Sequence, residues 1–130
     1  MDIIEMQEMV KQFCDARDWE QFHNPKDLAI GISTEANELL DMFRFKSEEQ
    51  MKVMMETPTK KEAISDELAD TLYFILRFAQ MNDIDLTEAL VRKIKKNDEK
   101  YPVEKVIGKN LKYKEYWRWK NNVWNSQRKI

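Results

Sequence analysis

The sequence is poor in several residues on which whole protein classes depend. Its 130 residues include one cysteine, two glycines and three prolines. The single cysteine, Cys14, excludes an intrachain disulfide and suits a reducing compartment. The chain has no glycine-rich Walker loop, which excludes a P-loop nucleoside triphosphatase.

Long apolar runs are also missing. No stretch approaches the roughly 18 consecutive apolar residues that a membrane span requires. The N-terminus, MDIIEMQEMVKQ, carries acidic residues where a signal peptide would have its apolar run. These absences predict a soluble, cytoplasmic protein without a membrane partner.

Charge is unevenly distributed along the chain. The formal net charge is −2, but residues 105–130 carry eight basic side chains and one acidic one, whereas residues 1–104 carry 14 basic and 23 acidic ones. We therefore expect a helical domain over residues 1–116 and a basic, aromatic tail over residues 117–130.

The tail allows two interpretations. Interleaved aromatic and basic residues can bind single-stranded nucleic acid by stacking and phosphate contacts. Alternatively, Trp117, Trp119 and Trp124 dock on the acidic body or on another protomer. We favour docking, so nucleic acid is not the expected partner.

What the sequence does contain is helical periodicity. Apolar residues recur at helical spacing over residues 2–17, 25–43, 59–81 and 85–100. Asn24 before Pro25 is typical of a helix start, Ser47 with Gln50 predicts a capping box for a short helix to Met55, and Thr59 with Glu62 predicts another. The inward positions expected on the first and third long helices are Ile3, Met6, Val10, Phe13, Ile64, Leu68, Leu72, Ile75 and Phe78 or Ala79.

Four amphipathic helices with short connections predict an all-α protein, an antiparallel four-helix bundle. Some of the apolar stripes are wide for so few helices. We therefore expect a homo-oligomer, in which a second face of some helices is buried.

Two pairs of carboxylates each have one member, Glu35 or Glu67, among the apolar positions of a predicted helix. Glu35 and Glu38 are three residues apart on one predicted helix, and Glu67 and Asp70 are three apart on another. Glu35 falls on the apolar stripe of its helix, and an unpaired buried carboxylate is costly unless it takes up a proton or a cation. The pair at positions 5 and 8 has the same spacing but lies off the stripe of its helix, so spacing alone is not the signal.

Four converging carboxylates require positive charge between them. Ligation by oxygen alone suits Mg²⁺ or Mn²⁺. A di-iron bundle site uses Glu-x-x-His on two helices, and this chain has one histidine, His23, in a predicted loop. A magnesium–carboxylate cluster on a small helical domain suggests phosphate chemistry.

Several segments carry a resemblance to a known family. The sequence contains EANE at 35–38 and ELAD at 67–70, together with RDWEQFHNPKDLA at 17–29 and KIKKNDEKYPVEK at 93–105. In this order they resemble the MazG-like, all-α nucleoside triphosphate pyrophosphohydrolases, especially the dCTP pyrophosphatase branch. The resemblance covers about residues 3–116.

The resemblance implies hydrolysis of a nucleoside triphosphate to the monophosphate and pyrophosphate, with dCTP or a modified pyrimidine dNTP as the expected substrate in nucleotide-pool sanitation. It implies dimers or tetramers. It implies that Mg²⁺ is held, and catalysis carried, by Glu35, Glu38, Glu67 and Asp70. Substrate-binding residues implied in the same way are Trp19, His23, Lys93, Asn97 and Tyr101.

The sequence also departs from the family pattern. Thr34 and Asn37 stand where relatives often have glycine, Phe45 where they often have tryptophan, Phe74 where some have tyrosine and Val10 where some have histidine. The departures leave the predicted metal ligands intact but leave the base preference open. An alternative function is a non-enzymatic helical interaction module that uses its acidic face or its basic, aromatic tail.

Overall fold

The computed structural model describes residues 1–109, and every regular element among them is helical. The chain divides into two compact units, Met1–Leu86 and the residues from Thr87 onward, which we describe separately. The first unit contains α1 (Ile3–Asp15), the 3-10 helix η1 (Glu20–Phe22), α2 (Pro25–Phe43), α3 (Glu48–Glu56) and α4 (Pro58–Met81), whereas α5 (Leu86–Lys100) and α6 (Val103–Val106) follow.

The predicted all-α class is therefore confirmed. Within residues 1–109, no helix combines the length and the apolar character that crossing a membrane would require. The predicted boundary between a helical domain and a tail at residues 116 and 117 lies outside the described residues and stays a prediction.

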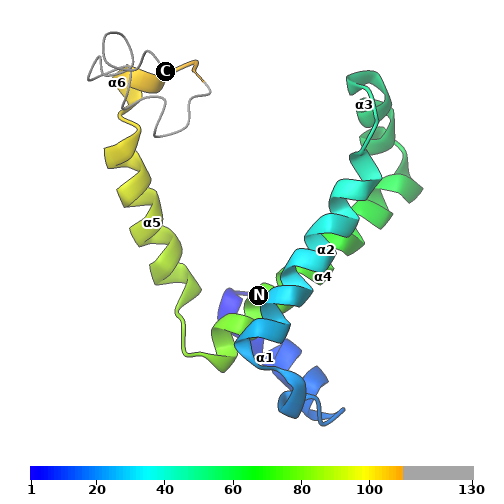
Figure 1. The fold of residues 1–130 in the computed structure, drawn as a ribbon, viewed down its shortest axis with the longest axis vertical. Helices are drawn as coiled ribbons and strands as arrows, with labels where there is room; N and C mark the ends of the chain where they lie inside the picture. Colours follow the sequence, from blue (N-terminus) through cyan, green and yellow to red (C-terminus); the bar gives the residue numbers. More distant parts are fainter. Residues whose placement is uncertain (110–130) are drawn as a thin grey trace, which may run out of the picture. The chain divides into compact units, whose positions relative to one another are not determined.

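The first unit is built around the pairing of α2 with α4. These two helices lie side by side and run in opposite directions, and α3 connects them at one end (Figure 1). α1 packs against α4, where the Gln7 side chain donates to the Leu76 carbonyl (3.2 Å) and Gln80 donates to the Gln7 carbonyl (3.0 Å). This arrangement places the predicted carboxylate pairs on facing helices.

Most of the predicted helix ends are confirmed. Asn24 Oδ1 accepts from the Asp27 amide at the start of α2, and the Ser47–Gln50 capping box opens α3. The predicted Thr59–Glu62 capping box is wrong, because α4 already begins at Pro58. Proline has no amide hydrogen to satisfy and a φ suited to the first helical position, so it starts the helix earlier than the box predicts.

The core of the first unit is small. Its buried apolar side chains are Cys14, Leu28, Met54, Ile64, Leu76 and Ala79. Leu68 and Leu72, predicted to face inward, are 53% and 42% exposed, and Phe13 is 43% exposed. Those three predictions are wrong for a single chain. Leu68 and Leu72 are exposed because the apolar stripe of α4 is wider than the surface that α1 and α2 cover.

At Gly31, α2 approaches the Phe74 side chain of α4 closely. A Cβ atom built there would lie 2.6 Å from Cδ1 and Cε1 of Phe74. We expect Gly31→Ala to lower the free energy of unfolding by about 1–3 kcal/mol, because the overpacked ring must move. Alanine is the better helix former by about 1 kcal/mol, which opposes this loss.

Urea unfolding of Gly31→Ala beside Ser33→Ala tests the expectation. Ser33 is exposed on the same helix, so its replacement reports helix propensity without a clash. A Gly31→Ala protein that is as stable as the Ser33→Ala control would show that Phe74 can move at no cost.

Candidate metal centre and adjoining pocket

Three carboxylates meet between α2 and α4. Glu35 and Glu38 lie on α2 and Glu67 lies on α4, and one oxygen from each is within 4.8 Å of the others. The spacing of three residues puts Glu35 and Glu38 on one side of α2, and the antiparallel pairing brings Glu67 opposite them. The convergence expected from the sequence is thus present for these three side chains.

Two of these carboxylates are only partly accessible to solvent, and each has an oxygen that lacks a hydrogen-bond partner. Oε2 of Glu35 and Oε2 of Glu67 are buried without a hydrogen-bond partner. Burial, then the adjoining Glu38 and the charges of Asp70 and Glu67, raise the pKa of Glu35 to about 7. Burial and the nearby Glu38 also raise the pKa of Glu67. Such a site favours protons or a cation over free negative charge.

Asp70, the fourth predicted carboxylate, is not in this group of three. It lies one turn further along α4, and its charge contributes to the raised pKa of Glu35 and of Glu67. Asp70 and Glu35 both line a cavity of about 550 Å³, so the carboxylates border a space large enough for a ligand.

The cavity beside the carboxylates is largely aromatic. Its walls are Phe13, Trp19, His23, Glu35, Ala69, Asp70, Tyr73 and Phe74. Trp19 and His23, two of the predicted substrate-binding residues, therefore line the same cavity as Glu35 and Asp70. An aromatic wall beside an acidic cluster can hold a flat ring while a cation and its phosphates occupy the cluster.

The loop before α2 carries Trp19 and His23 into place. Asp18 has a left-handed backbone (φ 53°) that ends the turn after α1, and the Trp19 amide donates to the Cys14 carbonyl at 3.1 Å. The Trp19 ring then packs edge-on against Phe13, with centroids 5.6 Å apart. The segment that resembles the family thus folds back onto α1 and presents its ring to the cavity.

Tyr73 and Phe13 are pocket residues that the sequence did not single out. The Tyr73 ring contacts Phe13 (6.1 Å between centroids) and Phe74 (5.0 Å). Its hydroxyl lies 3.1 Å from Sγ of Cys14, and burial with this contact raises the Tyr73 pKa, so the phenol stays neutral. Tyr73 follows Asp70 by three residues, a spacing that could have identified it.

The predicted contacts Lys93, Asn97 and Tyr101 belong to the second unit. Lys93 and Asn97 are four residues apart on α5, and the Tyr101 amide donates to the Asn97 carbonyl at 2.8 Å just after the helix ends. The spacing places positions 93 and 97 on one face of α5. Their part in a nucleotide site stays a prediction.

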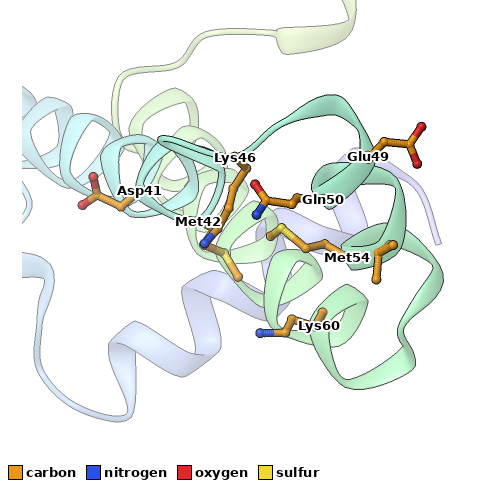
Figure 2. A pocket seen from close by; sticks show the side chains of 8 residues that line it. Asp41, Met42, Lys46, Glu49, Gln50, Met54 and Lys60 are labelled. Carbon is orange, nitrogen blue, oxygen red and sulfur yellow. The ribbon is translucent and has the colours of Figure 1, made fainter.

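A second cavity, of about 640 Å³, lies where α2, α3 and α4 meet (Figure 2). It is lined by Asp41, Met42, Lys46, Glu49, Gln50, Val53, Met54 and Lys60, none of which was predicted as a site residue. Phe45, which stands where relatives often have tryptophan, lines neither cavity and is 91% exposed. The aromatic cavity beside the carboxylates is therefore the better candidate site.

Known proteins are similar to this chain in sequence. The dCTP pyrophosphatase 1 of Mus musculus is 33% identical over 102 residues, covering 78% of this chain and 60% of that protein. The Homo sapiens protein of the same name is 31% identical over 104 residues, covering 80% and 61%. The chain thus spans about 60% of the length of these curated relatives.

A solved structure has the same fold. A pyrophosphatase from Archaeoglobus fulgidus superimposes with a TM-score of 0.70 at 35% identity, covering 75% of this chain and 90% of that one. The model of the MazG-like family matches residues 30–116, which include all four predicted carboxylates. The chain belongs to the MazG-like family.

Proposed function

We propose that this protein is a Mg²⁺-dependent nucleotide pyrophosphohydrolase that converts a (d)NTP to the (d)NMP and pyrophosphate. The observation that carries the proposal is the pair of buried, unpartnered carboxylate oxygens of Glu35 and Glu67 beside an aromatic cavity. The pyrophosphatase names of the relatives support the same reaction. A pyrimidine dNTP, dCTP or a modified form of it, is the proposed substrate, and sanitation of the cytoplasmic nucleotide pool the proposed role.

The donor set fits a hard divalent cation. Glu35, Glu38 and Glu67 offer oxygen ligands within reach of one another, and we assign Asp70 to the same site from its position one turn along α4. The unpartnered oxygens are what such an ion would neutralise, with Mn²⁺ as a possible substitute for Mg²⁺. When bound, the ion would supply charge neutralisation for the triphosphate in the transition state.

Other side chains would bind the base, accept the proton of the attacking water and contact the phosphates and sugar. Trp19 offers its ring to the base, and His23 offers a hydrogen bond beside it. Water attacks the α-phosphorus in line, the bond to the oxygen bridging the α- and β-phosphates breaks, and pyrophosphate leaves with that oxygen. A carboxylate of the site takes the proton of the water. Lys93, Asn97 and Tyr101 are assigned to phosphate and sugar contacts.

Self-association is part of the proposal. Ile30 and Leu40 on α2 and Leu68 and Leu72 on α4 leave large apolar side chains 42–56% exposed. Exposed apolar surface of this kind is buried in oligomers. A homodimer or homotetramer is the proposed assembly.

A substrate panel tests the function. Purified protein with Mg²⁺ is incubated with the common NTPs and dNTPs and with modified pyrimidine dNTPs, and the products are separated by ion exchange. We expect monophosphate and pyrophosphate, fastest from a pyrimidine dNTP. No hydrolysis of any nucleotide would favour the alternative, a non-enzymatic helical interaction module.

A further inference from the structure

Arg77 is a buried cation that the carboxylate site does not explain. Its side chain lies on α4, seven residues after Asp70, and is 1% exposed. No carboxylate of the described residues lies within ion-pair distance of its guanidinium, and one of its nitrogens, Nη2, is buried without a hydrogen-bond partner. Burying a cation without a counter-ion opposes folding, so its position needs another explanation.

The polar contacts of Arg77 are two neutral groups. Nε donates to Nδ1 of His23 at 2.9 Å, and Nη1 donates to Oε1 of Gln80 at 2.8 Å. Gln80 in turn donates to the Gln7 carbonyl of α1, which holds its amide in place. Arg77 therefore reaches from α4 to the loop that precedes α2, with its guanidinium oriented by a second hydrogen bond.

This contact determines the protonation of the His23 ring. A guanidinium remains charged in proteins and has only donors, so its partner must accept. Nδ1 of His23 must then carry a lone pair, and a ring with one free lone pair is neutral and holds its proton on Nε2. Burial and the charge of Arg77 also lower the His23 pKa, which agrees with a neutral ring.

His23 stands at the aromatic cavity. It lines the cavity with Trp19, Glu35 and Asp70, and its Nε2 has no hydrogen bond to any residue in the described range 1–109. The charged group that acts on the ring is Arg77 from α4, and the carboxylates of Glu35 and Asp70 line the same cavity. The N–H on Nε2 is therefore free to meet a ligand.

We propose that Arg77 is a positioning residue that fixes His23 as the neutral tautomer with its proton on Nε2. The pocket then presents one hydrogen-bond donor of fixed position beside Trp19, and it selects a substrate with a lone pair there, such as a carbonyl oxygen or ring nitrogen of a pyrimidine. The selective role rests on the proposed nucleotide hydrolysis. The tautomer itself does not.

The tautomer can be read directly because the chain has a single histidine. Long-range ¹H–¹⁵N correlation spectra of the full-length, ¹⁵N-labelled protein near neutral pH distinguish a protonated from an unprotonated ring nitrogen. We expect unprotonated Nδ1 and protonated Nε2. Arg77→Met should give a mixture of tautomers, and Arg77→Lys, which keeps a cationic donor, should restore the original pattern at least in part.

Gln7→Met supplies the matched control. Gln7 is buried between α1 and α4 and bonds to the Leu76 carbonyl, but it does not touch His23 through its side chain. Its replacement should lower the melting temperature and leave the tautomer unchanged. A wild-type ring protonated on Nδ1, or a pattern that Arg77→Met does not alter, would overturn the proposal.

Kinetics test the selective role on the substrate that the panel identifies. Arg77→Met should raise KM by the factor by which it lowers the population of the Nε2-protonated tautomer, about twofold for an even mixture, with a smaller change in kcat. In a His23→Ala background the same substitution should have no further effect, since the two side chains act as one unit. If the wild-type ring has the proposed tautomer, Arg77→Met alters it and KM nevertheless stays the same, the selective role is overturned. A protein that hydrolyses no nucleotide would refute the proposed function instead, and the spectra would still decide the tautomer.

Discussion

Glu67→Gln is expected to reduce nucleotide hydrolysis by about a hundredfold or more while raising the melting temperature of the metal-free protein. The rate falls because the variant lacks a carboxylate next to the charge that develops in the transition state. Removing a single such oriented group typically lowers kcat by a factor of this size. The melting temperature rises because Glu67 is repelled by Glu38 and has a buried oxygen without a hydrogen-bond partner. An amide keeps the shape of the side chain and removes its charge.

Two exposed glutamates supply the controls for this variant. Glu62→Gln changes the same helix away from the cluster, and Glu8→Gln changes one member of the Glu5–Glu8 pair, which repeats the three-residue spacing on α1. Both variants should retain wild-type turnover and nearly wild-type stability. Full activity in Glu67→Gln, measured beside them with a native circular dichroism spectrum, would show that the carboxylate cluster is not the metal site.

The metal-free protein should lose stability as the pH rises from about 4.5 to about 7. In that window the folded state holds a proton on Glu35, whose pKa is raised from 4.5 to about 7, and the unfolded state does not. The folded state therefore binds more protons, and stability falls with pH until Glu35 is ionised. The raised pKa of Glu67 acts in the same direction, whereas the lowered pKa of His23 acts in the opposite one, so the loss is measured as the difference from Glu35→Gln.

Magnesium should reverse this dependence. The ion binds the deprotonated carboxylates, so its stabilising effect should be small near pH 5 and large near pH 8. Thermal melts across pH with EDTA or with Mg²⁺ measure both curves. Glu35→Gln should flatten the metal-free curve. If Mg²⁺ raises the melting temperature equally at pH 5 and pH 8, these carboxylates do not bind it.

The helices were the most predictable part of the structure. The sequence predicted α2 over Pro25–Phe43 because it marks both ends locally, with Asn24 as the cap and proline at the first position. The bounds of α4 were less predictable, because a proline and a capping box offered competing starts two residues apart. Local signals thus place a helix well, whereas the choice between neighbouring starts depends on the surrounding contacts.

Inward and outward positions were harder to predict. Periodicity assigned Leu68 and Leu72 to the core, yet both are exposed in the single chain. Periodicity also gave no reason to expect Arg77 in the interior, since a charged residue on a helix is normally solvated. Its burial depends on His23 and Gln80, which are brought together only when α4 packs against the loop before α2.

The candidate site was predictable to the extent that it depends on two helices. Glu35 on an apolar stripe signalled an unusual carboxylate, and the antiparallel pairing of α2 with α4 brings Glu67 to it. The aromatic wall was only partly predictable, because Phe13 comes from α1 and no local pattern relates it to Tyr73. Contacts between residues that are distant in the sequence can be predicted only once the packing of the helices is known.

A product-resolved assay of dCTP hydrolysis tests the central claim most directly. Wild-type protein is followed by ³¹P NMR with Mg²⁺ and with EDTA, beside Glu67→Gln under the same conditions. We predict dCMP and pyrophosphate from the wild-type protein with Mg²⁺, and almost none from the EDTA sample or the variant. Release of orthophosphate and dCDP, or no product at all, would contradict the proposed pyrophosphohydrolase. Equal turnover in the variant would contradict its carboxylate site.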